Sequence, residues 1–269
     1  MTLSKFFKYN NTPLYDGAAP INLQTTGYDG LYQADATQRF VLGTTFETWD
    51  GRKFRYAKSG GVALVQGYMN QTAVQESKMV EIAQTGYAQS AGSTAITVLC
   101  TTGSAADEDA FSGGYLVCNK VSPAVLGDIY GIISSKLQST DTLLDLVLDT
   151  PWRNAMLVTG EISMTYSRWY KSVVVPTATQ TACVNGVALC PVPIGYFYWS
   201  QVKGPCPVIV DTGDTVEIGS YIGNPRTSAV PGACGPVTTV TTEQLRTVWG
   251  RAMSIATAAE PAMIDLMLE

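Results

Sequence analysis

The C-terminal stretch Arg246-Thr-Val-Trp-Gly-Arg-Ala-Met-Ser-Ile-Ala-Thr-Ala-Ala-Glu-Pro-Ala-Met-Ile-Asp-Leu-Met-Leu268 contains two alternating runs joined by small residues. In the first run, one face carries Val248, Gly250, Ala252, Ser254 and Ala256, and the other carries Trp249, Arg251, Met253 and Ile255. In the second run, Met263 precedes Ile264-Asp-Leu-Met-Leu268, again with a period of two. Because successive side chains of a strand point to opposite faces, the two runs predict a β-hairpin.

The rest of the chain repeats this pattern of short strands between turn residues. Within residues 45–56, Asp50-Gly51 predicts a hairpin with a type I′ turn. Further strands are predicted over residues 62–71, 93–101, 111–118, 127–135, 143–149 and 161–175, and another hairpin over residues 206–219. Such a rhythm is typical of an all-β protein, here an antiparallel β-sandwich or barrel with little helix.

The N-terminal region differs from the rest in its density of turn formers. Residues 1–38 are therefore predicted to form an extended N-terminal arm. Such an arm grips a neighbouring subunit or folds back on its own domain, and the sequence favours neither. Residues 39–269 are predicted to form a β-rich domain, and its division into two β subdomains near residues 150–160 stays open.

The segment 186–205 is the aromatic centre of the chain, because it contains Tyr196-Phe-Tyr-Trp199. Four consecutive aromatic residues on a strand occupy both faces, so at least one face must meet a second layer or a neighbour. We expect a buried strand, and the alternative is an exposed platform for carbohydrate.

Three stretches together resemble bacteriophage head-decoration, or cement, proteins. The first is the C-terminal hairpin, and the second is the pattern Asp-Gly-Arg-x-Phe-Arg-Tyr-Ala-x-x-Gly-Gly-x-Ala-Leu over residues 50–64, continued to Gln71. The third is the aromatic element that ends in Trp199-Ser-Gln-Val-Lys-Gly-Pro205. The resemblance also favours a strand over residues 248–256, where Thr242–Trp249 would otherwise suit the start of a capped helix.

This resemblance implies a structural virion protein rather than an enzyme. Such a protein binds the outside of the phage capsid and stabilises the expanded shell. Its expected partners are the major capsid protein and further copies of itself, as a homotrimer. Its expected location is the capsid exterior, after synthesis in the bacterial host cytoplasm.

Composition excludes several other classes of protein. Only 14% of the 269 residues are charged, against about 25% in typical soluble domains. Low charge favours a surface covered by subunit contacts, and the alternative is a secreted β protein. The net charge is −5 without any Lys/Arg run, so we expect no direct nucleic-acid binding. We expect no membrane span, because no apolar run approaches about 20 residues. We expect no signal peptide, because the N-terminal Met-Thr-Leu-Ser-Lys-Phe-Phe-Lys lacks a long apolar core.

Few residues suit catalysis or metal binding. The chain has no histidine, which excludes Ser-His-Asp and Cys-His chemistry. Three acidic groups remain. We interpret Asp107-Glu108-Asp109 as a solvated loop tip, and Asp145 and Asp149 as part of the exposed face of a strand. Asp211, Asp214 and Glu217 fall in a predicted turn and could ligate calcium loosely, but they form no EF-hand pattern. We expect no metal and no cofactor.

The six cysteines, Cys100, Cys118, Cys183, Cys190, Cys206 and Cys234, form no C-x-x-C pair. We expect them to be reduced thiols. The spacing of Cys183 and Cys190 also fits two facing strands of a hairpin.

Two alternatives to the decoration role belong to other classes of protein. One is a β-sandwich module of a head or tail fibre that binds host glycans through exposed Tyr198 and Trp199. The other, a glycoside hydrolase, needs two carboxylates in one cleft, which the sequence does not reveal.

Overall fold

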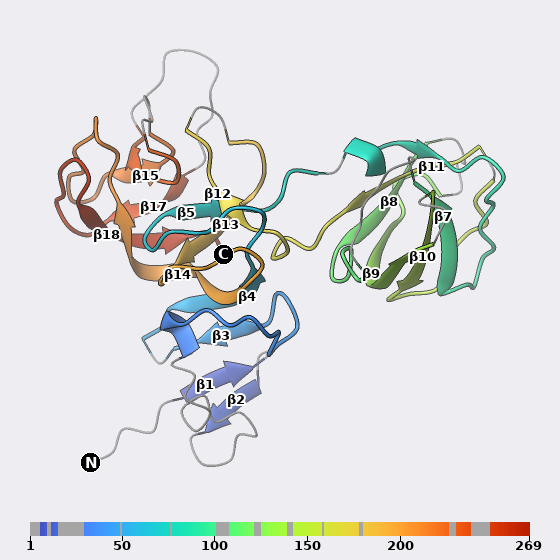
Figure 1. Cartoon of the computed structure of the whole chain (residues 1–269), viewed down its shortest axis with the longest axis horizontal. Coiled ribbons are helices and arrows are strands. Elements are labelled where there is room, and N and C mark those ends of the chain that lie inside the picture. Colours follow the sequence, from blue (N-terminus) through green and yellow to red (C-terminus); the bar gives the residue numbers. More distant parts are fainter. Residues whose placement is uncertain are drawn as a thin grey trace. The chain divides into compact units, whose positions relative to one another are not determined.

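The computed structural model describes residues 6–9, 12–15, 30–48, 50–75, 77–100, 108–120, 125–138, 142–157, 159–177, 180–225, 230–237 and 248–269. Over these residues the secondary structure consists of β-strands and two short 3-10 helices, η1 (Gly30–Tyr32) and η2 (Ser77–Met79). All paired strands of both sheets are antiparallel, which confirms the predicted all-β class (Figure 1). No helix in these ranges is long and apolar enough to cross a membrane.

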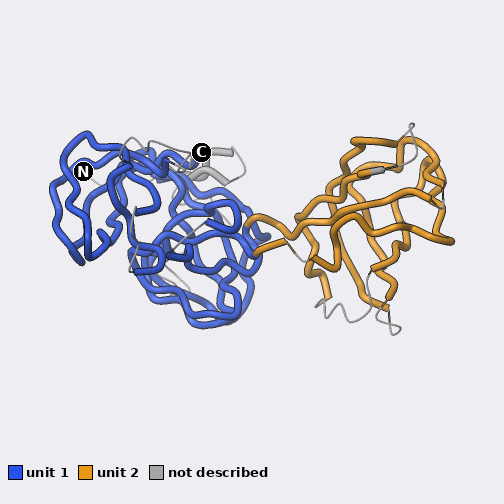
Figure 2. The backbone as a smooth tube through the Cα atoms, turned by 90° about the horizontal axis from the view of Figure 1, so that it is seen from above, with its two compact units in different colours: residues 1–73, 169–269 blue, residues 74–168 orange. Residues whose placement is uncertain are grey.

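The chain divides into two compact units (Figure 2). Unit 1 comprises residues 1–73 and 169–269, and unit 2 comprises residues 74–168. Unit 2 is therefore an insertion in unit 1, and the chain crosses between the units twice. The single boundary near residues 150–160 differs from this division. It would separate β11 (Glu161–Thr165) from its partner β8 (Tyr115–Lys120) within unit 2.

Unit 1 is built on one large sheet in the order β16-β15-β17-β18-β14-β4-β3-β1-β2, with β13, β5 and β12 branching from β14. Its strands are β1 (Phe6–Tyr9), β2 (Thr12–Tyr15), β3 (Thr45–Glu47), β4 (Lys53–Lys58), β5 (Met69–Gln71), β12 (Val173–Val174), β13 (Val184–Ala188), β14 (Phe197–Ile209), β15 (Tyr221–Gly223), β16 (Gly235–Pro236), β17 (Val248–Ala252) and β18 (Pro261–Met267).

The long strand β14 organises unit 1. It pairs with β18 along one side and with β4 along the other. One face of β14 packs Phe197, Trp199 and Cys206 into a large apolar core, and the other face packs Tyr198 and Val202 into a second core. A register shift between Gln201 and Lys203 makes Val202 a bulge residue. After the bulge, the residues that face outward are therefore Lys203, Pro205 and Pro207.

The C-terminal hairpin forms as predicted. β17 and β18 pair through Gly250↔Leu266 and Ala252↔Ile264. Along β18, Ala262, Ile264 and Leu266 are buried, which confirms the period of two. β17 departs from its predicted faces, because a register shift against β15 inserts Trp249 as an extra residue. Trp249 therefore lies in the core on the same side as Gly250 and Ala252.

The Asp50-Gly51 hairpin forms between β3 and β4, but its turn is not type I′. Thr48 N donates to Arg52 O at 2.9 Å, and Gly51 N donates to Thr48 O at 3.0 Å. Gly51 has φ +84°, whereas Asp50 is not among the described residues with positive φ. A type I′ turn needs positive φ at both central residues, so this loop matches the longer hairpin loop with one left-handed glycine.

Two other strand predictions fail in their details. Residues 206–219 form no hairpin, because Cys206–Ile209 continues β14 through two prolines and pairs with β18. The two prolines of β14 are Pro205 and Pro207. A proline has no backbone N–H, but the pairing of β14 with β4 ends at Lys203, so no hydrogen bond from either proline to β4 is lost. Residues 161–175 are interrupted after Thr165, and Lys171 there has φ +54°.

Unit 2 is a curled antiparallel sheet in the order β6-β11-β8-β9-β10-β7 (Figure 1). Its strands are β6 (Ile82–Ala83), β7 (Ala95–Leu99), β8 (Tyr115–Lys120), β9 (Ile129–Leu137), β10 (Leu143–Leu148) and β11 (Glu161–Thr165). Two buried glutamines cover the outer edge of β7. Leu99 N donates to Gln84 Oε1 at 2.7 Å, and Gln89 Nε2 donates to Thr97 O at 2.8 Å. Gln84 directly follows β6, so its amide links the two edge strands.

The described part of the predicted arm folds onto unit 1. β1 and β2 form a hairpin, and β1 pairs with β3 through Lys8↔Glu47 and Tyr9↔Phe46. Further along, Asp35 forms an isolated bridge with Phe197 of β14. The described arm segments therefore extend the sheet of their own chain.

Candidate functional site

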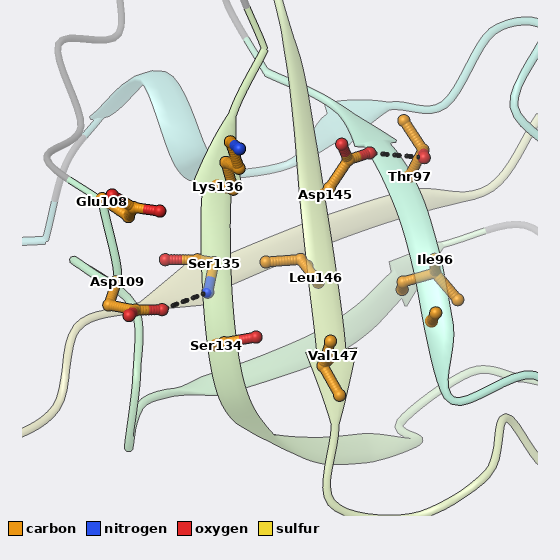
Figure 3. Close-up of a pocket in the computed structure, with 11 residues that line it drawn as sticks. Ile96, Thr97, Glu108, Asp109, Ser134, Ser135, Lys136, Asp145, Leu146 and Val147 are labelled. Carbon is orange, nitrogen blue, oxygen red and sulfur yellow. Dashed lines mark hydrogen bonds between the residues drawn. The ribbon is translucent and has the colours of Figure 1, made fainter.

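A hollow of about 440 Å³ on unit 2 brings together two of the acidic groups singled out in the sequence (Figure 3). Glu108 and Asp109 line it from the loop before β8, and Asp145 lines it from β10. Lys136 of β9 adds a cation between them. Asp107 lies outside the described residues.

The two aspartates of this hollow have structural partners. Asp145 Oδ1 accepts hydrogen bonds from Thr97 Oγ1 at 2.7 Å and from Gln138 Nε2 at 2.8 Å. Asp109 Oδ1 accepts from Ser135 N at 3.0 Å, and Asp109 N donates to Ser135 O at 2.7 Å. Asp109 thus takes the place of a neighbouring strand beside β9, and its φ of +58° serves that role. The two aspartates of the hollow therefore hold strands in place.

The remaining acids are dispersed. Asp149 accepts a hydrogen bond from Gly131 N at 3.0 Å. Asp211 is fully buried and accepts from Val230 N at 2.9 Å, whereas Glu217 is exposed. Among the residues that the structure describes, no three His, Cys, Asp or Glu side chains gather closely enough to hold a metal ion.

The aromatic centre is a buried strand, as we expected. Phe197, Tyr198 and Trp199 are 7%, 0% and 3% exposed. Trp199 packs against Phe46 and Tyr56, with ring centroids 5.5 and 5.1 Å apart. The expectation of glycan contact through exposed Tyr198 and Trp199 is therefore wrong for these residues, because both sheet faces of β14 are covered at this point.

All six cysteines are thiols, and only Cys183 is exposed. Burial raises the pKa of Cys118 and of Cys234 to about 12. Cys183 and Cys190 do not face one another across a hairpin, because they flank the same strand, β13. Their spacing carries no information about pairing.

The outward face of the C-terminal sheet in unit 1 carries several exposed apolar side chains. We call it the outer face, and it comprises Lys203, Pro205 and Pro207 of β14, Tyr221 of β15, Arg251 and the adjoining Met253, and Met263, Asp265 and Met267 of β18. Met253, Met263 and Met267 are 46%, 49% and 53% exposed. The opposite face of β18, with Ala262, Ile264 and Leu266, is buried in the core.

Cross-strand rows organise the outer face. One row contains Tyr221, Arg251, Asp265 and Pro205, in register across four strands. The Arg251 guanidinium lies 4.5 Å from the Tyr221 ring centroid, and its Nη2 donates to Tyr221 Oη. The next row places Met253 beside Met263, with Met253 N donating to Met263 O at 2.8 Å, and Pro207 follows. The polar side chains Arg251 and Asp265 thus lie in a row between Met263 and Met267.

The outer face was partly visible in the sequence. The alternation of Met263 and Met267 with buried residues predicts that both lie on one face. Asp265, which shares this face, indicates that the face is the exposed one. Nothing in the sequence indicated that Tyr221 and Pro205 would join it, since neither belongs to the hairpin.

Comparison with known proteins adds no relative: no protein-family model, no curated protein and no solved structure matches this chain.

Proposed function

We propose that this chain is a structural protein of a bacteriophage virion that binds the outside of the capsid and stabilises the expanded shell. One observation carries the proposal. The C-terminal hairpin, which carries much of the resemblance to decoration proteins, is also the element that presents exposed methionines on the outer face. Methionine adapts its shape to a partner surface, and exposed apolar patches commonly mark contact sites.

The proposed action is thermodynamic and needs no catalytic group. A protein that binds only the expanded shell lowers the free energy of that state by mass action, and the effect grows with the ratio of free protein to dissociation constant. The low charge of the chain suits a surface that subunits cover. The proposed partners are the major capsid protein and two further copies of this chain.

A binding assay on purified shells tests the proposal. Wild-type protein and a Met263→Asp, Met267→Asp double variant are titrated onto expanded shells that lack this protein. We expect the double variant to bind at least about tenfold more weakly, because each carboxylate would have to be desolvated in the contact. Ile194→Asp is the matched control, since Ile194 is 60% exposed in unit 1 but lies outside the outer face.

Two outcomes would contradict this proposal. If wild-type protein fails to bind shells, the capsid role is wrong. If all three proteins bind equally, the chain binds capsids by another surface. The trimer is tested separately by light scattering, where a monomer at working concentration contradicts it.

A further inference from the structure

The outward side of the sheet in unit 2 carries an exposed aromatic ring and the hollow of Figure 3 on successive rows of side chains. We call it the unit 2 face, and it consists of three cross-strand rows: Tyr115, Gly131 and Asp149; Ser134, Val147 and Ala95; Lys136, Asp145 and Thr97. The second and third rows line the hollow. Side chains two apart on a strand share a face, so the three rows span about 13 Å at about 3.3 Å per residue.

The first row places a carboxylate beside an exposed ring. Tyr115 is 56% exposed and lies directly opposite Gly131. The Asp149 carboxylate fills the space where a side chain of Gly131 would lie, because a Cβ on Gly131 would be 2.5 Å from Asp149 Oδ2. Asp149 Oδ1 accepts from Gly131 N at 3.0 Å and from Thr150 Oγ1 at 3.2 Å. The carboxylate is therefore held in place through Oδ1, next to the base of the Tyr115 side chain.

The third row repeats this arrangement inside the hollow. Thr97 Oγ1 and Gln138 Nε2 both donate to Asp145 Oδ1, and no described residue donates to Asp145 Oδ2. Lys136 is paired with Asp145 across the strands, but its ammonium forms no salt bridge with a residue that the structure describes. Glu108 is exposed on the other side of Lys136 (Figure 3). Acceptors and a cationic donor therefore alternate along the hollow.

The chemistry of these groups limits what they can bind. A carboxylate only accepts hydrogen bonds and an ammonium only donates them, whereas a hydroxyl does both. A cationic ligand in the hollow would meet Lys136, and an anionic one would meet Glu108 and Asp145. A neutral ligand with several hydroxyls is compatible with all three. An exposed tyrosine ring adds a flat apolar surface, against which the C–H face of a sugar ring can pack.

We propose that the unit 2 face binds a neutral oligosaccharide. One sugar ring packs on Tyr115 and donates a hydroxyl to Asp149, and a linked ring in the hollow bonds to Asp145 and Lys136. More than one ring is needed because the rows span about 13 Å. The ring-stacking residue is thus Tyr115 in unit 2, whereas Tyr198 and Trp199 are buried in unit 1. The site does not rest on the proposed capsid role, since unit 2 contributes no residue to the outer face.

A glycan array tests this site with the full-length protein. The array carries short neutral oligosaccharides of glucose, galactose, mannose and N-acetylglucosamine, together with sialylated oligosaccharides and an oligolysine peptide. We expect wild-type protein to be retained on at least one neutral oligosaccharide, and Tyr115→Ala to bind it at least about tenfold more weakly. Tyr32→Ala is the matched control, because Tyr32 is 55% exposed but belongs to unit 1, and it should bind like the wild type.

A second variant tests the hollow independently of the ring. Lys136→Met keeps the aliphatic part of the side chain and removes the ammonium, so we expect weaker retention on the same oligosaccharide. Lys203→Met, at an exposed lysine of unit 1, should have no effect. If Tyr115→Ala does not fold, the Lys136 variant decides alone.

Three results would overturn the site. The first is wild-type protein that binds no neutral oligosaccharide, and if it still binds shells, the capsid role stands without this site. The second is retention only on sialylated glycans or on oligolysine, which would indicate a charged ligand. The third is retention that the folded unit 2 variants leave unchanged, or that the control variants reduce equally.

Discussion

Ala259 adopts a left-handed backbone conformation, with φ +63°, in the exposed turn between β17 and β18. The turn is held by Glu260 N donating to Thr257 O at 3.1 Å and Ala259 N donating to Val210 O at 3.0 Å. A Cβ in this conformation costs about 1–2 kcal/mol, so the turn is strained at one residue of the chain's most informative hairpin.

We predict that Ala259→Gly stabilises the protein by about 0.5–1 kcal/mol, because relief of this strain exceeds the added entropy of the unfolded chain. Ala258→Gly is the matched control. Ala258 is equally exposed in the same turn without positive φ, so its replacement should destabilise by about 0.5–1 kcal/mol. Urea denaturation measures both, and equal effects of the two variants would show that Ala259 is not strained.

Buried thiols make the stability depend on alkaline pH. Burial raises the pKa of Cys118 to about 12 from an ordinary value of 9.0. A raised pKa in the folded state means that the folded protein favours the neutral thiol. Its contribution to stability is complete below pH 9 and is lost as the pH rises toward 12. The expected slope is about 1.4 kcal/mol per pH unit for each such thiol.

We predict that the free energy of unfolding falls between pH 9 and 12, and that Cys118→Ala makes this fall shallower. Cys183→Ala, at the exposed cysteine, should leave the slope unchanged. Urea denaturation across this pH range measures the slopes. A Cys118→Ala slope identical to that of the wild type would refute the assignment.

At the scale of elements, buried glutamine side chains cover the edge of β7, and Gln84 covers it at Leu99. Gln84 is fully buried, accepts from Leu99 N at 2.7 Å and donates to Leu99 O at 3.2 Å. It thus supplies the hydrogen bonds that a further strand would supply. A free strand edge invites pairing with other chains, so the side chain also protects unit 2 from association.

Gln84→Ala should destabilise unit 2 by about 2–3 kcal/mol and speed hydrogen exchange at the Leu99 amide, because two backbone groups lose their partners. The exposed Gln66 provides the control variant, Gln66→Ala, for which we expect no change. Hydrogen exchange followed by mass spectrometry measures both. Unchanged protection at Leu99 in the Gln84 variant would mean that another group covers the edge.

The sequence predicted where strands lie better than it predicted their bulges and loop lengths. The alternation of residue types predicted correctly which side chains of β18 share a face, and every second residue of that strand is buried. Alternation placed Trp249 on the wrong face, because a bulge is set by the register of the neighbouring strand rather than by the strand's own residues. The Asp50-Gly51 pair likewise predicted a hairpin but not its loop length. The unit 2 face left no local signal, since Tyr115 and Lys136 are distant in sequence from each other and from β7.

At the scale of the whole molecule, the insertion of unit 2 was not predicted. Both units have the same strand-and-turn rhythm, so nothing in composition marks residues 74 and 168 as boundaries. Contacts between the two ends of the insertion reveal them. Gln75 Nε2 donates to Met164 O at 3.3 Å, and Ile82 of β6 pairs with Ile162 of β11. The segment therefore leaves unit 1 and returns to it through adjacent positions.

We predict that residues 74–168 fold cooperatively when expressed alone, because this unit has its own buried core and adjacent ends. A fragment of residues 74–155 is the control. It lacks β11, which lies between β6 and β8, and it should remain unfolded. Circular dichroism during thermal unfolding distinguishes the two. Cooperative unfolding of the shorter fragment would support a boundary near residues 150–160 instead.

The central claim is the proposed role on the capsid, and its most direct test is the copy number of this chain in virions. Quantitative mass spectrometry of purified particles gives the ratio of this chain to the major shell protein. We predict a ratio of order one, because the outer face must meet repeated sites on the shell. A few copies per particle would place the chain in a tail or fibre, and its absence from particles would contradict the proposed function.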